Sequence, residues 1–80
     1  MRRYTIFLNP DPAHGVYTVT VPSLPGVVAQ GRNIDESLER AREAIELHLR
    51  GLVTDGEEIP EESVSPQLAT VYVSEVVATV

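Results

Sequence analysis

Apolar and polar residues alternate in two short stretches near the start of the chain, which is the spacing of a β-strand. In residues 3–8 (RYTIFL) every second side chain from Tyr4 to Leu8 is apolar. Residues 16–21 (VYTVTV) alternate in the same way and are rich in β-branched residues. The prolines of NPDPAHG disfavour helix between them. The pattern therefore predicts two strands joined by a loop over residues 9–15.

A turn and a third strand are predicted in the stretch VPSLPGVVAQG, residues 21–31. Proline presets φ at the first central position of a β-turn, and glycine supplies the positive φ that a type II turn needs at the second. Pro25-Gly26 has this order. We therefore expect a turn with positive φ at Gly26, followed by a short strand over residues 27–31.

One long amphipathic helix is predicted after this strand. Asn33 is a residue type that caps helices, and Glu36 three residues later completes the reciprocal capping pattern. The Asp-Gly pair at residues 55–56 predicts the end of the helix. Between them, apolar residues recur at steps of three and four and form a predicted buried stripe of Ile34, Leu38, Ala41, Ile45, Leu49 and Leu52.

The last part of the chain predicts an exposed acidic loop and then a strand. Residues 57–66 (EEIPEESVSP) carry four glutamates and two prolines and show little periodicity. Residues 69–80 (ATVYVSEVVATV) are strongly strand-prone and apolar on both faces, with Val71, Val73 and Val77 on one of them. A strand with two apolar faces is expected to be buried on both faces by its own chain, or to be covered by a second chain.

The predicted order of elements is β-β-β-α-β. Three antiparallel strands, one long helix on a face of the sheet and a last strand at an edge make a two-layer α+β fold with a mainly antiparallel sheet. Eighty residues are too few for two ordinary domains. No internal repeat or boundary divides the chain, so we expect a single domain over residues 1–80.

Charge and composition narrow the class of partner. The net charge is −6, from twelve acidic and six basic residues, and such a surface repels nucleic-acid phosphates and favours a basic protein. The chain has no cysteine, which excludes disulfides and thiolate zinc sites. Its longest apolar run is broken by Pro22 and Pro25 and resembles neither a membrane span nor a secretion signal. We expect a cytoplasmic protein.

Catalytic and metal-binding chemistry finds little support in the sequence. His14 stands in a predicted loop without an identifiable Ser or Cys nucleophile, and no pair of histidines has the helical spacing of a zinc site. We therefore expect no catalytic residue, no metal and no cofactor. One enzyme alternative stays open, a small metal-dependent hydrolase or nuclease that uses Asp11, His14 and the acids of residues 55–62.

The run GVYTVTVPSLPGVVAQGRNIDESLERAREAIELHL, followed by DGEEIP, resembles the HicB family of antitoxins and HicB-like orphan proteins. The resemblance covers residues 15–60 and implies a partial RNase H-like fold. It also implies a role in which the N-terminal domain masks a small basic HicA-type mRNA-cleaving toxin, while a separate domain binds DNA. This sequence departs from the pattern in two ways. It ends after the last predicted strand, with no room for a separate DNA-binding domain, and it has Val27 where many relatives have Cys.

RNase H enzymes place several carboxylates around two metal ions, whereas the predicted strands here carry almost none. The leading hypothesis is therefore a non-catalytic HicB-like antitoxin that binds and neutralises a HicA-type toxin, and the alternative is an orphan HicB-like binding module of unknown partner. We expect no direct contact with nucleic acid or membrane. The predicted partner-binding residues are Glu57, Glu58, Glu61 and Glu62, and a homodimer is expected to form partly through Val71, Val73 and Val77.

Overall fold

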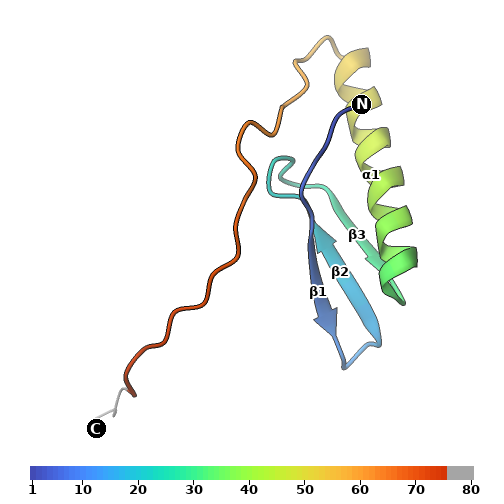
Figure 1. The fold of residues 1–80 in the computed structure, drawn as a ribbon. Coiled ribbons are helices and arrows are strands. Elements are labelled where there is room, and N and C mark those ends of the chain that lie inside the picture. Colours follow the sequence, from blue (N-terminus) through green and yellow to red (C-terminus); the bar gives the residue numbers. More distant parts are fainter. Residues whose placement is uncertain (76–80) are drawn as a thin grey trace, which may run out of the picture.

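The computed structural model describes residues 1–75 of the chain. Three strands are followed by one long helix, and the helix lies against one face of the sheet (Figure 1). The α+β fold class predicted from the sequence is thus confirmed. The elements are β1 (Phe7–Asp11), β2 (Val16–Thr20), β3 (Val28–Gly31) and α1 (Ile34–Thr54).

The three strands form one antiparallel sheet in the order β1-β2-β3, so that β1 and β3 are its edges. Leu8 on β1 lies opposite Val19 on β2, and Val19 lies opposite Ala29 on β3. Val19 is fully buried. The predicted alternation therefore places the apolar side chains of the central strand in the core.

The first strand lies further along the chain than predicted. The sequence pattern indicated a strand over residues 3–8 and a loop over residues 9–15, whereas β1 spans Phe7–Asp11 and includes Pro10. Proline cannot donate a hydrogen bond to a neighbouring strand, but an edge strand tolerates it. β1 is such an edge strand, so Pro10 fits into it. The predicted bounds of the first strand and of the following loop were therefore wrong.

The stretch between β2 and β3 forms two consecutive turns and also supplies the centre of the core. The Leu24 N–H donates to the Val21 carbonyl at 3.0 Å, and the Val27 N–H donates to the Leu24 carbonyl at 3.1 Å. Gly26 has a φ of 94°, so the predicted turn with positive φ is confirmed. Val21, Leu24 and Val27 are all buried and form one cluster, so this stretch contributes to the core as well as joining the strands. Val27, which was predicted as the first residue of the third strand, precedes β3.

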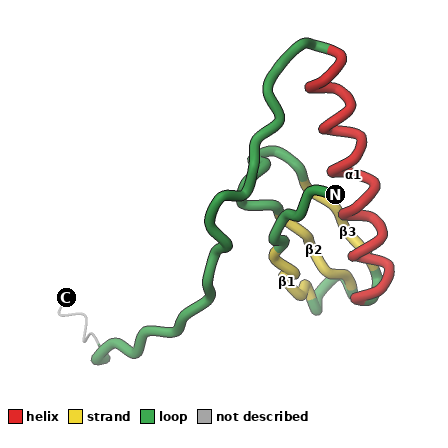
Figure 2. The backbone as a smooth tube through the Cα atoms, turned by 45° about the horizontal axis from the view of Figure 1, so that its top comes forward, coloured by secondary structure: helices red, strands yellow, loops and turns green. Residues whose placement is uncertain are grey.

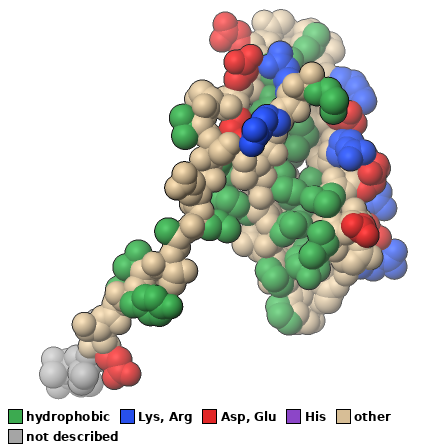
Figure 3. Space-filling model, viewed as in Figure 1, with side chains coloured by type: hydrophobic (Ala, Val, Ile, Leu, Met, Phe, Trp, Pro, Cys, Tyr) green, Lys and Arg blue, Asp and Glu red, His purple; other side chains and the backbone are tan. Residues whose placement is uncertain are grey.

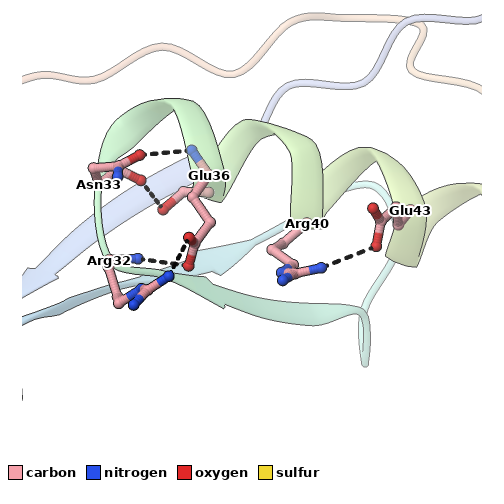
Figure 4. A network of polar contacts seen from close by, with 6 residues as sticks. Arg32, Asn33, Glu36, Arg40 and Glu43 are labelled. Carbon is pink, nitrogen blue, oxygen red and sulfur yellow. Dashed lines mark hydrogen bonds and ion pairs between the residues drawn. The ribbon is translucent and has the colours of Figure 1, made fainter.

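The start of α1 is fixed by Asn33, as predicted. Its side-chain oxygen accepts a hydrogen bond from the Glu36 N–H at 2.7 Å, and its carbonyl accepts one from the Ser37 hydroxyl at 2.7 Å (Figure 4). The Glu36 carboxylate reaches one residue further back than the reciprocal pattern predicts, and accepts from the Arg32 N–H at 3.2 Å. The Glu36 N–H, one of the N–H groups at the helix start that lack a partner within the helix, is thereby satisfied.

Helix α1 lies over β3 and, to a smaller extent, β2 (Figure 2). Ser37 and Ala41 are its buried residues. Ile34 and Leu38, which the predicted stripe placed in the core, are 51% and 45% exposed. The reason is the position of the helix, since its side toward β1 extends beyond the two strands that it covers.

The predicted strand over residues 69–80 is not formed by residues 69–75, which have no strand structure. The chain instead leads away from the sheet and the helix in an extended path (Figure 1). A strand needs a neighbour for its backbone N–H and C=O groups, and none lies beside this segment within residues 1–75. Val77 lies outside the described residues.

Candidate partner-binding site

The acidic loop begins where α1 ends. The Asp55 N–H donates to the Gly51 carbonyl at 3.0 Å, and the Glu57 N–H donates to the Leu52 carbonyl at 2.9 Å. Gly56 has a φ of 71°, a conformation that glycine adopts without strain. The predicted end of the helix at the Asp-Gly pair is therefore confirmed.

The loop and the N-terminal residues enclose a groove of about 870 Å³, which we call the acidic groove. Three of the four predicted partner-binding acids line it, and all three are exposed. Carboxylates beside apolar surface suit arginine and lysine, which combine an apolar stem with a charged head. The lining residues are Arg2, Val53, Gly56, Glu57, Glu58, Ile59, Pro60 and Glu61.

The fourth predicted acid, Glu62, makes internal hydrogen bonds. Its carboxylate accepts from the Thr5 N–H at 2.6 Å and from the Thr5 hydroxyl at 2.8 Å, and the Ser23 hydroxyl donates to it at 3.4 Å. The Thr5 N–H, and after it the Thr5 and Ser23 hydroxyls, hold the pKa of Glu62 below its ordinary value. Glu62 thus ties the acidic loop to the N-terminal segment.

Two further contacts hold the same loop in place. The Tyr4 hydroxyl donates to the Pro60 carbonyl at 2.5 Å, and Arg2 pairs with Glu61 at 3.3 Å. Ile59 is half-buried between exposed acidic neighbours. The walls of the acidic groove are therefore positioned by bonds between the N-terminal segment and the acidic loop.

Charges along α1 are largely paired with one another. The Arg32 side chain lowers the pKa of Glu36 by hydrogen bonding to it. Figure 3 shows acidic and basic side chains alternating along the outer face of the helix. Glu57 and Glu58, in contrast, make no ion pair within residues 1–75, so unpaired negative charge gathers at the acidic groove. The helix pairs are Arg32–Glu36, Arg40–Glu43 and Arg42–Glu39, at 3.2, 3.4 and 3.4 Å.

The residues of the hydrolase alternative fall into two separate places. Asp11 and His14 pair at 2.8 Å in the turn between β1 and β2. That turn and the acidic loop lie at opposite ends of the molecule (Figure 1). Over residues 1–75, no three His, Asp or Glu side chains converge in a way that could hold a metal ion. In the same part of the chain, no helix is both long and apolar enough to cross a membrane.

Comparison with known proteins identifies the family. The family model of the HicB-like antitoxin of bacterial toxin-antitoxin systems matches residues 4–78, nearly the whole chain. The chain belongs to the HicB-like antitoxin family. It is 46% identical over 57 residues to a UPF0150 protein of Archaeoglobus fulgidus, covering 69% of this chain and 81% of the relative. A UPF0150 protein of Thermoplasma acidophilum is 36% identical over 61 residues, covering 76% of this chain and 87% of that protein.

Two solved structures share the fold of this HicB-like chain. The Burkholderia pseudomallei antitoxin HicB superposes with a TM-score of 0.69 at 36% identity, covering 84% of this chain and 48% of that one. The N-terminal domain of the same antitoxin gives a TM-score of 0.63 at 37% identity, covering 78% and 69%. This chain thus spans about half the length of the solved antitoxin. The family resemblance predicted from the sequence is confirmed.

Sequence reasoning located the acidic loop of this HicB-like domain but missed how it is held. Glu62 looked like its three acidic neighbours because its partner Thr5 is 57 residues away in the chain. One signal was present, since Ile59 is an apolar residue inside an acidic run and apolar residues favour burial. It indicated that the loop packs against the body.

Proposed function

We propose that this chain is a non-catalytic antitoxin that binds and neutralises a small, basic, HicA-type mRNA-cleaving toxin. Membership of the HicB-like antitoxin family over residues 4–78 is the observation that supports this most strongly. The net charge of −6 suits a basic partner. The single domain over residues 1–80 and its action in the cytoplasm belong to the same proposal.

The acidic groove is the surface that we assign to the toxin. Glu57, Glu58 and Glu61 are exposed around it, and Val53 and Ile59 add apolar area between the charges. Exposed charges mainly speed the encounter with an oppositely charged partner, while apolar and hydrogen-bonded contacts hold the complex. Glu62 acts in this proposal as a positioning residue, because its bonds to Thr5 fix the loop that carries the other acids.

Binding is tested with the short basic protein encoded by the reading frame beside this gene. We expect the two proteins to co-purify when they are expressed together and only one carries a tag. Failure to co-purify, with both chains folded, contradicts the proposal. If the neighbouring frames encode no such protein, the alternative of an orphan binding module is favoured.

The role of the acidic groove is tested with two triple variants of equal net charge. At low salt, neutralising the groove acids should slow association by about tenfold or more, because steering by charge acts on the association rate. Neutralising three acids on the outer face of α1 should leave the rate within about twofold. Equal rates for the two variants contradict the assigned surface. The groove variant carries Glu57→Gln, Glu58→Gln and Glu61→Gln, and the control carries Glu39→Gln, Glu43→Gln and Glu46→Gln.

A further inference from the structure

A second groove, lined mainly by apolar side chains, lies between the N-terminal segment and α1. Its volume is about 570 Å³, and we call it the apolar groove. It lies on the side of α1 toward β1, the strand that the helix leaves uncovered. Apolar side chains gather on this face of the molecule (Figure 3). Its main lining residues are Tyr4, Ile6, Leu38, Ala41, Ile45 and Leu49.

The second unpartnered feature is the extended segment of residues 66–75, which we call the arm. Val71, Tyr72 and Val73 are 81%, 93% and 83% exposed. Small soluble proteins rarely leave a continuous apolar run bare. The one charged residue of the arm is Glu75, at its described end, so the remainder of the arm can be buried without removing a charge from water.

The arm starts beside the N-terminal segment that leads into β1 and then leads away from the sheet and the helix. The bonds from Thr5 to Glu62 hold the chain against the segment that leads into β1. From there the arm leads away from the sheet in both views (Figures 1 and 2). The arm and the apolar groove of one chain are therefore apart in this conformation, and within residues 1–75 the outer edge of β1 has no neighbouring strand.

The arm has the length and character that the groove requires. Ten extended residues span about 33 Å, and the stretch of α1 from Leu38 to Leu49 that forms one wall spans about 17 Å, so the arm is long enough to cross the groove. Alternation along a strand puts Val71 and Val73 on the same face. Three charged side chains line the apolar groove; Arg2 and Arg42 are opposite in charge to Glu75 of the arm, and the third is Glu46.

We propose that two copies of this chain exchange arms. Residues 66–75 of each copy lie along the free edge of β1 in the other copy and place Val71 and Val73 in its apolar groove. Added in this way, the arm pairs its backbone groups with β1, and one two-fold axis covers both grooves at once. The acids assigned to toxin binding, Glu57, Glu58 and Glu61, take no part, so this inference is independent of toxin binding.

Light scattering after size-exclusion chromatography tests the assembly. At a concentration on the order of tens of micromolar, where weak association is visible, we expect twice the chain mass of 8.8 kDa. Val73→Lys in the arm and Leu38→Lys in the groove should each give a monomer that keeps its circular dichroism spectrum. The matched control Leu47→Lys changes a leucine that is 68% exposed elsewhere on α1 and should stay dimeric.

Mixing the two monomeric variants decides between arm exchange and its alternatives. The Leu38→Lys chain has an intact arm and the Val73→Lys chain has an intact groove, so an equimolar mixture should form a heterodimer through one arm. An arm that folds into its own groove would leave the mixture monomeric. A dimer that does not use the arm would leave Val73→Lys dimeric on its own. Either result, or a wild-type monomer at tens of micromolar, overturns the proposal.

Discussion

Replacing Gly31 by alanine should destabilise the fold, because β3 and α1 approach each other most closely there. A Cβ atom at Gly31 would lie 2.7 Å from the Ser37 Cα and 2.5 Å from its backbone nitrogen. Ordinary carbon contacts are about 3.5–4.0 Å. Ser37 cannot shift alone, since its N–H and its hydroxyl both donate to the Asn33 carbonyl, at 3.0 and 2.7 Å. Overpacking of this kind costs about 1–3 kcal/mol.

Thermal unfolding followed by far-ultraviolet circular dichroism measures the effect. In a domain of this size about 1 kcal/mol moves the Tm by roughly 4–8 °C, so Gly31→Ala should lower it by about 4–24 °C. Gly51→Ala is the matched control, because a Cβ there meets no atom within 4 Å. Alanine is favoured over glycine in a helix by up to about 1 kcal/mol, so this variant should melt higher. A Gly31→Ala protein that melts at or above the wild-type temperature, at equal concentration, refutes the reasoning.

Three further predictions concern single side chains. Gly26→Val forces a branched residue to a φ of 94° and should cost about 1 kcal/mol or more, so an unchanged Tm would count against the turn. Asn33→Ala removes the 2.7 Å cap and should cost about 1 kcal/mol in urea unfolding, and an unshifted midpoint would show that the cap is dispensable. Folding lowers the pKa of Glu62 below its ordinary 4.5, so its stabilisation is present above that pH and is lost as the pH falls through the lowered pKa. Glu62→Gln should therefore flatten the acid dependence of stability below that pH. Equal slopes of stability against pH for the variant and the wild type would exclude a stabilising role of the Glu62–Thr5 bonds.

The parts of the fold that were predictable from the sequence depend on local interactions. The cap at Asn33 bonds to Glu36 three residues away, and Gly26 needs its φ because of the turn that contains it. Such signals act over a few residues and are visible in the chain itself. The end of the helix at Asp55-Gly56 is another example.

The parts that were wrong depend on positions set by distant residues. Pro10 belongs to a strand because β1 happens to be an edge, which no local pattern reports. Leu38 fits a buried stripe by its spacing, yet it is 45% exposed because α1 lies over β2 and β3. The strand tendency of residues 69–75 is real in composition but finds no partner within the described chain.

The candidate site shows the same division. A run of glutamates around Pro60 could be recognised as an acidic surface from charge alone. Separating Glu62 from Glu61 required the position of Thr5, because their chemistry is identical and only Glu62 accepts the hydrogen bonds of Thr5.

A titration of RNA cleavage tests the proposed function most directly, with the toxin that we propose as the partner. Purified toxin is mixed with increasing amounts of this chain, and the rate at which a reporter RNA is cut is measured. We expect cleavage to stop at about one equivalent of antitoxin. At low salt, the variant with Glu57, Glu58 and Glu61 replaced by glutamine should inhibit cleavage more slowly after mixing. Undiminished cleavage in a large excess of folded chain would contradict the proposed function.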